Sequence, residues 1–191
     1  MFLAIDGLDG SGKSSAAASV AEALRARGLE VEVREHPGPG FWGRACRRML
    51  LREGGAAVAL SAAFLFLDMA CTAPAARRSR KGGVLIAVRY DLSAYFLRPG
   101  AARTVHALFS ALMPMPDLEV VVDVEPEVAL ARVSARGEEQ EAFENRESMD
   151  RVRKAMLAVP GITVVDGGGS PEETVEGIMA AVGPMLPEVT V

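Results

Sequence analysis

Short apolar runs alternate along the chain with longer segments in which apolar residues recur at helical spacing. The runs that predict strands are Phe2 to Ile5, Leu29 to Val33, Gly83 to Val88, Leu118 to Val122 and Ile162 to Val165. The helical pattern covers Lys13 to Arg27, Trp42 to Arg52, Leu60 to Arg80, Pro126 to Ala135, Glu144 to Leu157 and a last segment that begins after Ser170. Strands that alternate with helices predict an α/β fold, a parallel sheet of about five strands with helices on both faces.

Composition narrows the class of protein. The 191 residues are 50% hydrophobic and 24% charged, which is typical of one globular domain, here predicted as residues 1–191. The net charge of −4 argues against a generic nucleic-acid-binding protein. The longest apolar stretch, Ala56 to Leu67, is shorter than the roughly 18 residues of a membrane span. We therefore expect a cytoplasmic protein that binds neither a membrane nor a nucleic-acid polymer, with Cys46 and Cys71 as reduced thiols.

A glycine-rich segment follows the first predicted strand and matches the phosphate-loop pattern GxxxxGK[ST] from Gly7 to Ser14. Glycines in such a loop let backbone N–H groups turn toward phosphate oxygens, and the following helix adds its dipole. Lys13 supplies a charge to the outer phosphates, and the Ser14 hydroxyl can ligate Mg²⁺. The pattern predicts binding of a nucleoside triphosphate, with ATP and Mg²⁺ as cofactors. The residues expected to bind it are Gly7, Asp9, Gly10, Ser11, Gly12, Lys13, Ser14 and Ser15.

The phosphate loop alone does not choose among kinases, GTPases and motor ATPases. The chain has no NKxD motif of the kind that binds guanine. The strand Gly83 to Val88 ends in Arg89-Tyr90, where a motor ATPase would carry an acidic pair. These features and the short chain favour a small phosphoryl-transfer enzyme.

Most of the positive charge is arginine, because only Lys13, Lys81 and Lys154 among the 21 basic residues are lysines. Arg44, Arg47, Arg48 and Arg52 recur at helical spacing, which fits either a clamp for a second phosphate or a solvated basic face. Arg89 follows a strand expected to be central, where an unpaired charge is unfavourable. That position is where open α/β sheets bind ligands, so we predict that Arg89 contacts a phosphate.

Nearly the whole chain resembles the thymidylate kinases, within the nucleoside monophosphate kinase group. FLAIDGLDGSGKSS resembles the phosphate loop of that family, and REHPGPGFWGRACRRMLL resembles REPGGTPxGxxIRxLL with His36 inserted. LSAAFLFLDM resembles the helix that supplies an aromatic residue to the base, and VRYDLSAYF resembles DRYxxSxxAYQ shortened by two residues. The segments PDLEVVVDVEPEVALARVSARG, FENRESMDRVRKAM and VVDGGGSPEETVEGI match the rest of the family pattern.

The resemblance implies transfer of the γ-phosphoryl of Mg-ATP to a deoxynucleoside monophosphate, most simply dTMP. It implies that Lys13 and Glu35 act at the transferring phosphates and that Arg47 and Arg89 bind the acceptor phosphate. Asp9 would hold the sugar, Tyr95 would lie near it, and Phe64 or Phe66 would lie against the base. Ser11 stands where some relatives have an arginine, so a lid over about 134–148 would supply the catalytic arginine, Arg136 first and Arg146 next. The resemblance also implies a homodimer, to which the helix Leu60 to Leu67 could contribute.

Two departures from the family leave alternatives open. The aspartate of DRY is Val88 here, although Asp6 or Asp91 could compensate for it. The arginine that usually contacts the base is also absent, and Asp68 lies near that place. If Asp68 is buried it could accept a hydrogen bond from an amino group on the base, which would suit cytosine or adenine; otherwise it is a surface acid. The alternatives are a kinase for another nucleotide or nucleoside and a weakly catalytic nucleotide-binding homologue.

Overall fold

Five parallel strands form the centre of the computed structural model, which describes residues 1–52, 54–97, 99–136 and 145–186. The strands are β1 (Phe2–Gly7), β2 (Val31–Glu35), β3 (Val84–Val88), β4 (Leu118–Asp123) and β5 (Thr163–Asp166), and their order in the sheet is β2-β3-β1-β4-β5. The connection from β1 to β2 passes over the position of β3, the connection from β3 to β4 passes over β1, and β1 lies in the middle of the sheet. This order confirms the α/β fold with a five-stranded parallel sheet.

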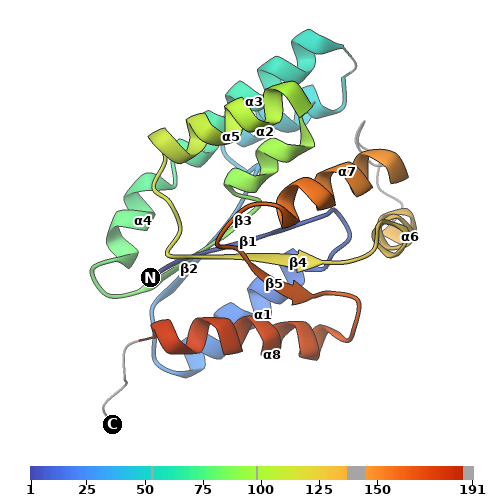
Figure 1. Ribbon diagram of the computed structural model, residues 1–191. Coiled ribbons are helices and arrows are strands. Elements are labelled where there is room, and N and C mark those ends of the chain that lie inside the picture. The colour runs from blue at the N-terminus through green and yellow to red at the C-terminus, as the bar shows by residue number, and fades with distance from the viewer. Residues whose placement is uncertain (53, 98, 137–144, 187–191) are drawn as a thin grey trace.

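Helices cover both faces of the sheet (Figure 1). One face carries α1 (Lys13–Ala26) and α8 (Pro171–Val182). The other face carries α2 (Phe41–Leu50), α3 (Gly55–Ala70), α4 (Ala73–Ser79), α5 (Pro99–Leu112), α7 (Arg146–Leu157) and the 3₁₀ turn η1 (Asp91–Phe96). The helix α6 (Pro126–Arg136) packs on α7, and a second 3₁₀ turn, η2 (Gly183–Met185), follows α8.

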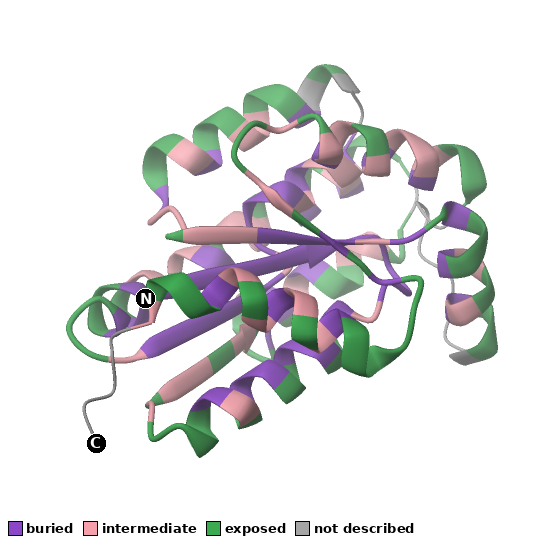
Figure 2. Cartoon of the chain, turned by 60° about the horizontal axis from the view of Figure 1, so that its bottom comes forward, coloured by how far each residue is buried: buried purple, intermediate pink, exposed green. Residues whose placement is uncertain are grey.

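The alternation of side chains along β1 builds two cores, one on each face. Leu3 and Ile5 point toward α1 and α8, and Phe2 and Ala4 point toward α3 and α5; all four are fully buried. Buried residues accordingly run along the central strands, while exposed residues line the outer sides of the helices (Figure 2). A sheet buried on both faces explains why its strands read as continuous apolar runs in the sequence.

Several predicted elements differ from the structure. The segment Leu60 to Arg80 forms two helices, α3 and α4, with a turn at Cys71 and Thr72 between them. Strand β2 lies two residues later than the predicted Leu29 to Val33. The helix α5 was not predicted, although Ala102, Val105, Phe109 and Met113 recur at helical spacing and pack inward.

One helical stretch in the described part of the chain is long and apolar enough to span a membrane. It runs from Gly55 to Ser79, with a mean hydropathy of 1.8, and 28% of its most apolar window is buried. In the sequence the apolar run stops before the charged residue Asp68, but the Asp68 side chain is buried in the protein. Because the core helices of soluble proteins can have the same length and apolar composition, the stretch is weak evidence for a membrane span.

Candidate active site

The phosphate loop connects β1 to α1 and takes a shape that only glycine adopts easily. Gly7 and Gly10 have φ angles of 145° and 84°, in the region that L side chains avoid. A Cβ on Gly10 would also lie 2.4 Å from the carbonyl oxygen of Ala129. The loop is thus held tightly against α6 and leads directly into α1, whose first residue is Lys13.

Two cations share one carboxylate at this loop. The Lys13 ammonium donates to Oδ1 of Asp9 at 2.9 Å and to the carbonyl oxygen of Leu8 at 2.9 Å. The Arg89 guanidinium donates to the same oxygen of Asp9. Burial by itself would raise the pKa of Asp9, but the charges and hydrogen bonds of Lys13 and Arg89 together hold that pKa well below its ordinary value. Residues from the loop, α1 and the end of β3 therefore meet at one point.

Oxygen ligands suited to a divalent cation lie beside the loop. The exposed Ser14 hydroxyl donates to Oε1 of Glu35 at 2.7 Å, which joins the start of α1 to the end of β2. A hydroxyl and a carboxylate are the kind of donors that Mg²⁺ prefers. These two residues fit the predicted metal site.

A cavity of about 410 Å³ lies on the other side of the loop, between α1, α6 and the segment that follows β5. Ser11, Gly12 and Ser15 of the loop line it together with Arg132. The Arg132 guanidinium donates to the carbonyl oxygens of Gly167 at 3.0 Å and Gly10 at 3.4 Å. Sequence reasoning missed Arg132. The signal that could have found it is its position on α6, a helix that packs against the loop.

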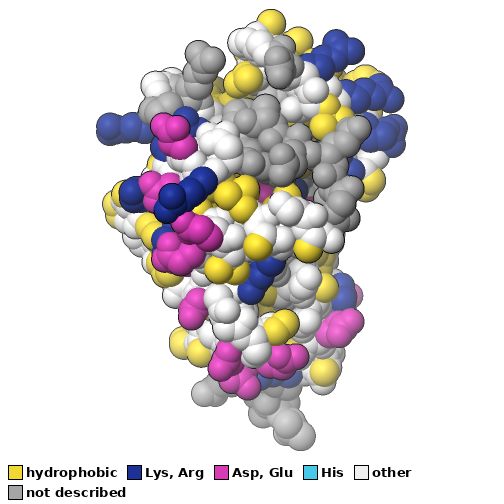
Figure 3. All heavy atoms as spheres, turned by 90° about the vertical axis from the view of Figure 1, so that its right-hand side faces the viewer, with side chains coloured by type: hydrophobic (Ala, Val, Ile, Leu, Met, Phe, Trp, Pro, Cys, Tyr) yellow, Lys and Arg dark blue, Asp and Glu magenta, His cyan; other side chains and the backbone are white. Residues whose placement is uncertain are grey.

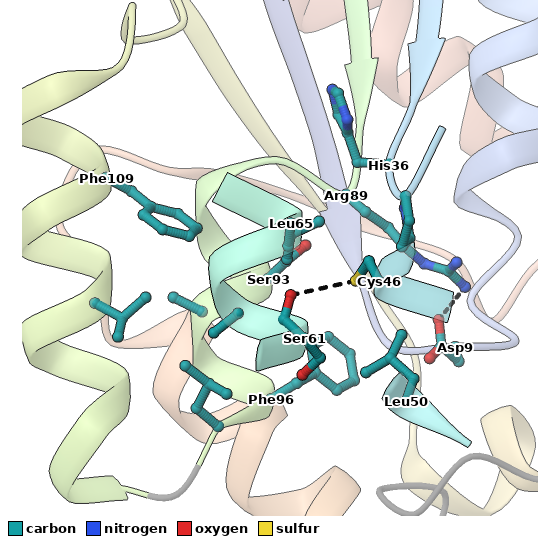
Figure 4. A pocket seen from close by; sticks show the side chains of 15 residues that line it. Asp9, His36, Cys46, Leu50, Ser61, Leu65, Arg89, Ser93, Phe96 and Phe109 are labelled. Atoms are coloured by element: carbon teal, nitrogen blue, oxygen red, sulfur yellow. Dashed lines mark hydrogen bonds and ion pairs between the residues drawn. The ribbon is translucent and has the colours of Figure 1, made fainter. Parts of the chain in front are cut away.

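The second cavity lies between η1, α2, α3 and α5, with Asp9 and Arg89 at its polar end (Figure 4). Most of its lining is apolar, and it includes Leu50, Leu65, Phe96 and Phe109. Figure 4 shows Arg89 and Asp9 pointing toward one another at the edge of this space. The cavity holds about 70 Å³, well below the ~300–1,000 Å³ typical of small-molecule sites, so a ligand the size of a nucleoside must displace lining side chains.

The aromatic residues predicted for the acceptor lie elsewhere. The Phe64 ring stacks on Trp42 with 6.0 Å between centroids, and Phe66 packs on Phe109 at 5.3 Å. Neither is among the residues that line the cavity, where Leu65 takes the intervening position on α3. The Tyr95 hydroxyl lies 3.3 Å from Nδ1 of His106 and faces a different cavity, bordered by α5 and α7.

Asp68 holds together the loop that carries the inserted His36. Its carboxylate lies 2.7 Å from Nδ1 of His36 and accepts the N–H of Gly38 at 2.7 Å. Burial opposes ionisation, but the hydrogen bonds from His36 and Gly38 hold the pKa of Asp68 below its ordinary value. Asp68 is thus buried and braces the loop through Oδ2, and it is not among the residues that line the cavity. Its contact with an amino group of the base stays a prediction.

Arginines of α2 bind the same loop. The Arg47 guanidinium donates to the carbonyl oxygen of Pro37, which lines the second cavity, and Arg44 donates to that of Pro39 at 2.6 Å. The helix thus braces the Pro/Gly segment, and Arg47 itself is not among the residues that line this cavity. Basic side chains gather in the upper part of the face shown in Figure 3, at the height of α2 and α3, and acidic ones predominate lower down.

The predicted lid lies largely outside the described residues, which omit 137–144. Arg136 is the last residue of α6, and its side chain is outside the description. Arg146 begins α7 and forms an exposed ion pair with Glu127 at 2.6 Å.

The position of the missing aspartate is filled by core packing. Val88 is 1% exposed and belongs to the core on the α1 side of the sheet. Asp6 and Asp91 are buried on the opposite side beside the partly buried Glu119, and the three residues have carboxylate oxygens within 4.8 Å of one another. Asp6 accepts from the backbone of Tyr90, and Asp91 lies 3.2 Å from Nε2 of His106.

Comparison with known proteins identifies the family to which these features belong. The family model described as Thymidylate kinase matches residues 5–178, from β1 into α8. The chain belongs to the thymidylate kinase family. It is 32% identical to the thymidylate kinase of Xanthomonas campestris pv. campestris (strain B100) over 195 aligned residues, which cover 95% of this chain and 82% of the relative. It is 31% identical to the probable thymidylate kinase of Pyrobaculum calidifontis, with 95% of each chain covered.

Membership confirms the resemblance drawn from the sequence motifs. The chain is a phosphotransferase of a nucleotide-binding kinase family, and ATP and nucleotide substrates follow from that membership. The relatives also include the thymidylate kinase of Xylella fastidiosa (strain 9a5c), 33% identical, with 95% of this chain and 90% of the relative covered.

Proposed function

We propose that this protein transfers the γ-phosphoryl group of Mg-ATP to dTMP and releases dTDP and ADP. The observation that carries the proposal is the position of Asp9 between Lys13 and Arg89, since it joins the phosphate loop to the second cavity, which we assign to the acceptor and call the acceptor-side cavity. Donor and acceptor phosphates bound on the two sides would meet beside these cations. The choice of thymine as the base of the acceptor rests on the names of the relatives, which are thymidylate kinases.

The chain's own residues account for binding and for charge stabilisation. The loop amides and Lys13 would hold the β- and γ-phosphates, and Arg89 and Arg47 would hold the phosphate of the acceptor. Ser14 and Glu35 would hold Mg²⁺, which neutralises phosphate charge when bound. Phosphoryl transfer needs positioning more than covalent chemistry, so cations fixed around the path of transfer lower its barrier.

An arginine of a lid over about 134–148, Arg136 first and Arg146 next, would complete the site. Arg146 would have to leave its exposed partner Glu127 to do so, and an exposed pair of this kind contributes only about 0–1 kcal/mol. Closure over the two nucleotides would exclude water and limit ATP hydrolysis.

A coupled assay of ADP release over nucleosides and nucleoside monophosphates tests this function. Turnover that is fastest with dTMP supports it. Faster turnover with another monophosphate or a nucleoside would replace dTMP as the acceptor. ATP binding without turnover on any acceptor would favour the second candidate, a weakly catalytic nucleotide-binding protein, which the burial of Val88 at the usual aspartate position supports.

We also propose that the protein acts in the cytoplasm as a homodimer. Apolar side chains are exposed on two neighbouring helices: Leu60 and Leu67 on α3, and Leu108 and Leu112 on α5. Exposed apolar residues on neighbouring helices are typical of an interface when they lie together. Sedimentation of the purified protein at micromolar concentration tests the dimer, which a mass of one chain would exclude.

A further inference from the structure

The backbone of Arg89 is in a left-handed conformation, with a φ of 58°. Arg89 is the single residue other than glycine with a positive φ in the described part of the chain. This conformation is unfavourable for an L side chain by roughly 1–2 kcal/mol and persists only where surrounding contacts impose it. Something in the fold must therefore hold the chain at this point.

The contacts that hold it come from β1. The N–H of Arg89 donates to the carbonyl oxygen of Ile5 at 3.2 Å, which continues the ladder between β1 and β3. The next N–H, that of Tyr90, donates to both carboxylate oxygens of Asp6, at 3.1 and 3.2 Å. Asp6 is 1% exposed, so water does not compete for this bond. The peptide groups on both sides of Arg89 are thus fixed to neighbouring residues of one strand.

The turn at Arg89 ends β3 and brings the guanidinium to Asp9 at the edge of the acceptor-side cavity. We propose that Asp6 is a positioning residue for Arg89: by accepting the amide of Tyr90, it fixes the left-handed backbone that directs Arg89 to the acceptor phosphate. This inference deepens the proposed function and rests on its assignment of Arg89.

The surroundings of Asp6 show which property of its side chain matters. Lys13 faces it from α1, Arg89 from the end of β3, Asp91 from η1 and Glu119 from β4, and His106 of α5 reaches the group through Asp91. Burial and, next, the charge of Asp91 raise the pKa of Asp6 to about 7. A carboxylic acid and a carboxylate both offer an oxygen to the Tyr90 amide, so positioning needs an acceptor at this place more than it needs a charge.

Asp6→Asn and Asp6→Ala separate these properties, because asparagine keeps a carbonyl acceptor and alanine does not. In Asp6→Ala we expect the hydrogen-exchange protection of the Tyr90 amide to fall about tenfold or more. We expect the KM for the acceptor to rise by a similar factor, with the KM for ATP changed less than about threefold. Asp6→Asn should stay within about threefold of wild type in all three measurements. Glu119→Gln, which changes the same cluster without touching Tyr90, is the matched control and should leave Tyr90 protection unchanged.

Binding calorimetry with dTMP and thymidine tests whether the effect passes through Arg89. The ratio of the two affinities reports the contact with the phosphate, and we expect Asp6→Ala to reduce this ratio as Arg89→Ala does, with no further reduction in the double variant. Equal protection of the Tyr90 amide in wild type and Asp6→Ala would overturn the proposal. Equal losses of acceptor affinity in Asp6→Asn and Asp6→Ala would also overturn it. The exchange measurement needs no turnover, so it reports on the contact even if the proposed acceptor is wrong.

Discussion

The Ser14 hydroxyl lies 2.7 Å from a carboxylate oxygen of Glu35, although 21 residues separate the two in the chain. The contact exists because β2 ends beside the start of α1 at the carboxyl edge of the sheet. It brings a metal ligand expected from the phosphate-loop pattern to an acid that the pattern does not contain.

Replacing Glu35 should weaken the response to Mg²⁺. In Glu35→Ala we expect the Mg²⁺ concentration for half-maximal activity to rise about tenfold or more, because a charged oxygen ligand is lost. Glu32→Ala, on the same strand, removes an acid that pairs with Arg34 and Arg78 and serves as control. Mg²⁺ titrations at saturating ATP measure the effect, and equal Mg²⁺ requirements in the two variants would contradict it.

Removing the loop lysine should nearly abolish transfer. In Lys13→Ala we expect kcat to fall by about 10³-fold or more, because the charge on the transferring phosphoryl group loses its buried partner. Lys154→Ala removes an exposed lysine paired with Asp150 and should change kcat by less than about twofold. Rates of ADP release at saturating substrates compare the two variants; similar rates would show that Lys13 has no role in the transfer.

Arg47→Ala should act mainly on the acceptor. Loss of a charge-assisted hydrogen bond of about 1.5–3 kcal/mol predicts an acceptor KM raised by about tenfold or more, with the KM for ATP nearly unchanged. Arg48→Ala, the next residue on α2, is the control. An unchanged acceptor KM in Arg47→Ala would mean that this arginine serves only to brace the carbonyl group of Pro37.

The raised pKa of Glu119 predicts that the free energy of unfolding depends on pH. Burial, followed by the charges of Asp91 and Asp6, raises the pKa of Glu119 to about 9. The folded state therefore binds a proton that the unfolded state releases between about pH 4.5 and 9, so this group destabilises the fold as pH rises through that window. The slope for one proton is at most about 1.4 kcal/mol per pH unit. Urea unfolding at pH 6 and 9 should show a smaller loss in Glu119→Gln than in wild type; equal losses would exclude Glu119 as the cause.

Local patterns in the sequence predicted most of the fold and the phosphate-loop side of the site. Lys13 and Ser14 belong to the same short segment as the loop, so the spacing of the motif is enough to predict where they lie relative to it. The break at Cys71 and Thr72 does have a signal, because Thr72 precedes α4 and Pro74 lies in its first turn, where proline is favoured. The run through α3 and α4 was nevertheless read as one helix. Helix α5 begins at Pro99-Gly100 and has mixed polarity, which hid the inward spacing of Phe109 and Met113.

The acceptor side depended on packing between distant segments, which spacing does not encode. Phe64, Leu65 and Phe66 are consecutive on α3, so the rotation of the helix about its axis decides which of them faces the cavity. Contacts with Trp42 and Phe109 set that rotation. Asp68 illustrates the same limit. Its burial was foreseen as one of two cases, but its partner His36 comes from a loop 32 residues earlier in the chain.

The shared carboxylate of Asp9 has a consequence for how the resting enzyme meets a phosphate ester. Asp9 neutralises one of the two positive charges of Lys13 and Arg89, so both cations are already engaged before a ligand binds. A phosphate ester gains those cations only by competing with Asp9, and the rest of the nucleotide supplies the binding energy for that exchange. Asp9 is thus an acceptor that a bound phosphate ester must displace before Lys13 and Arg89 can both donate to that ester.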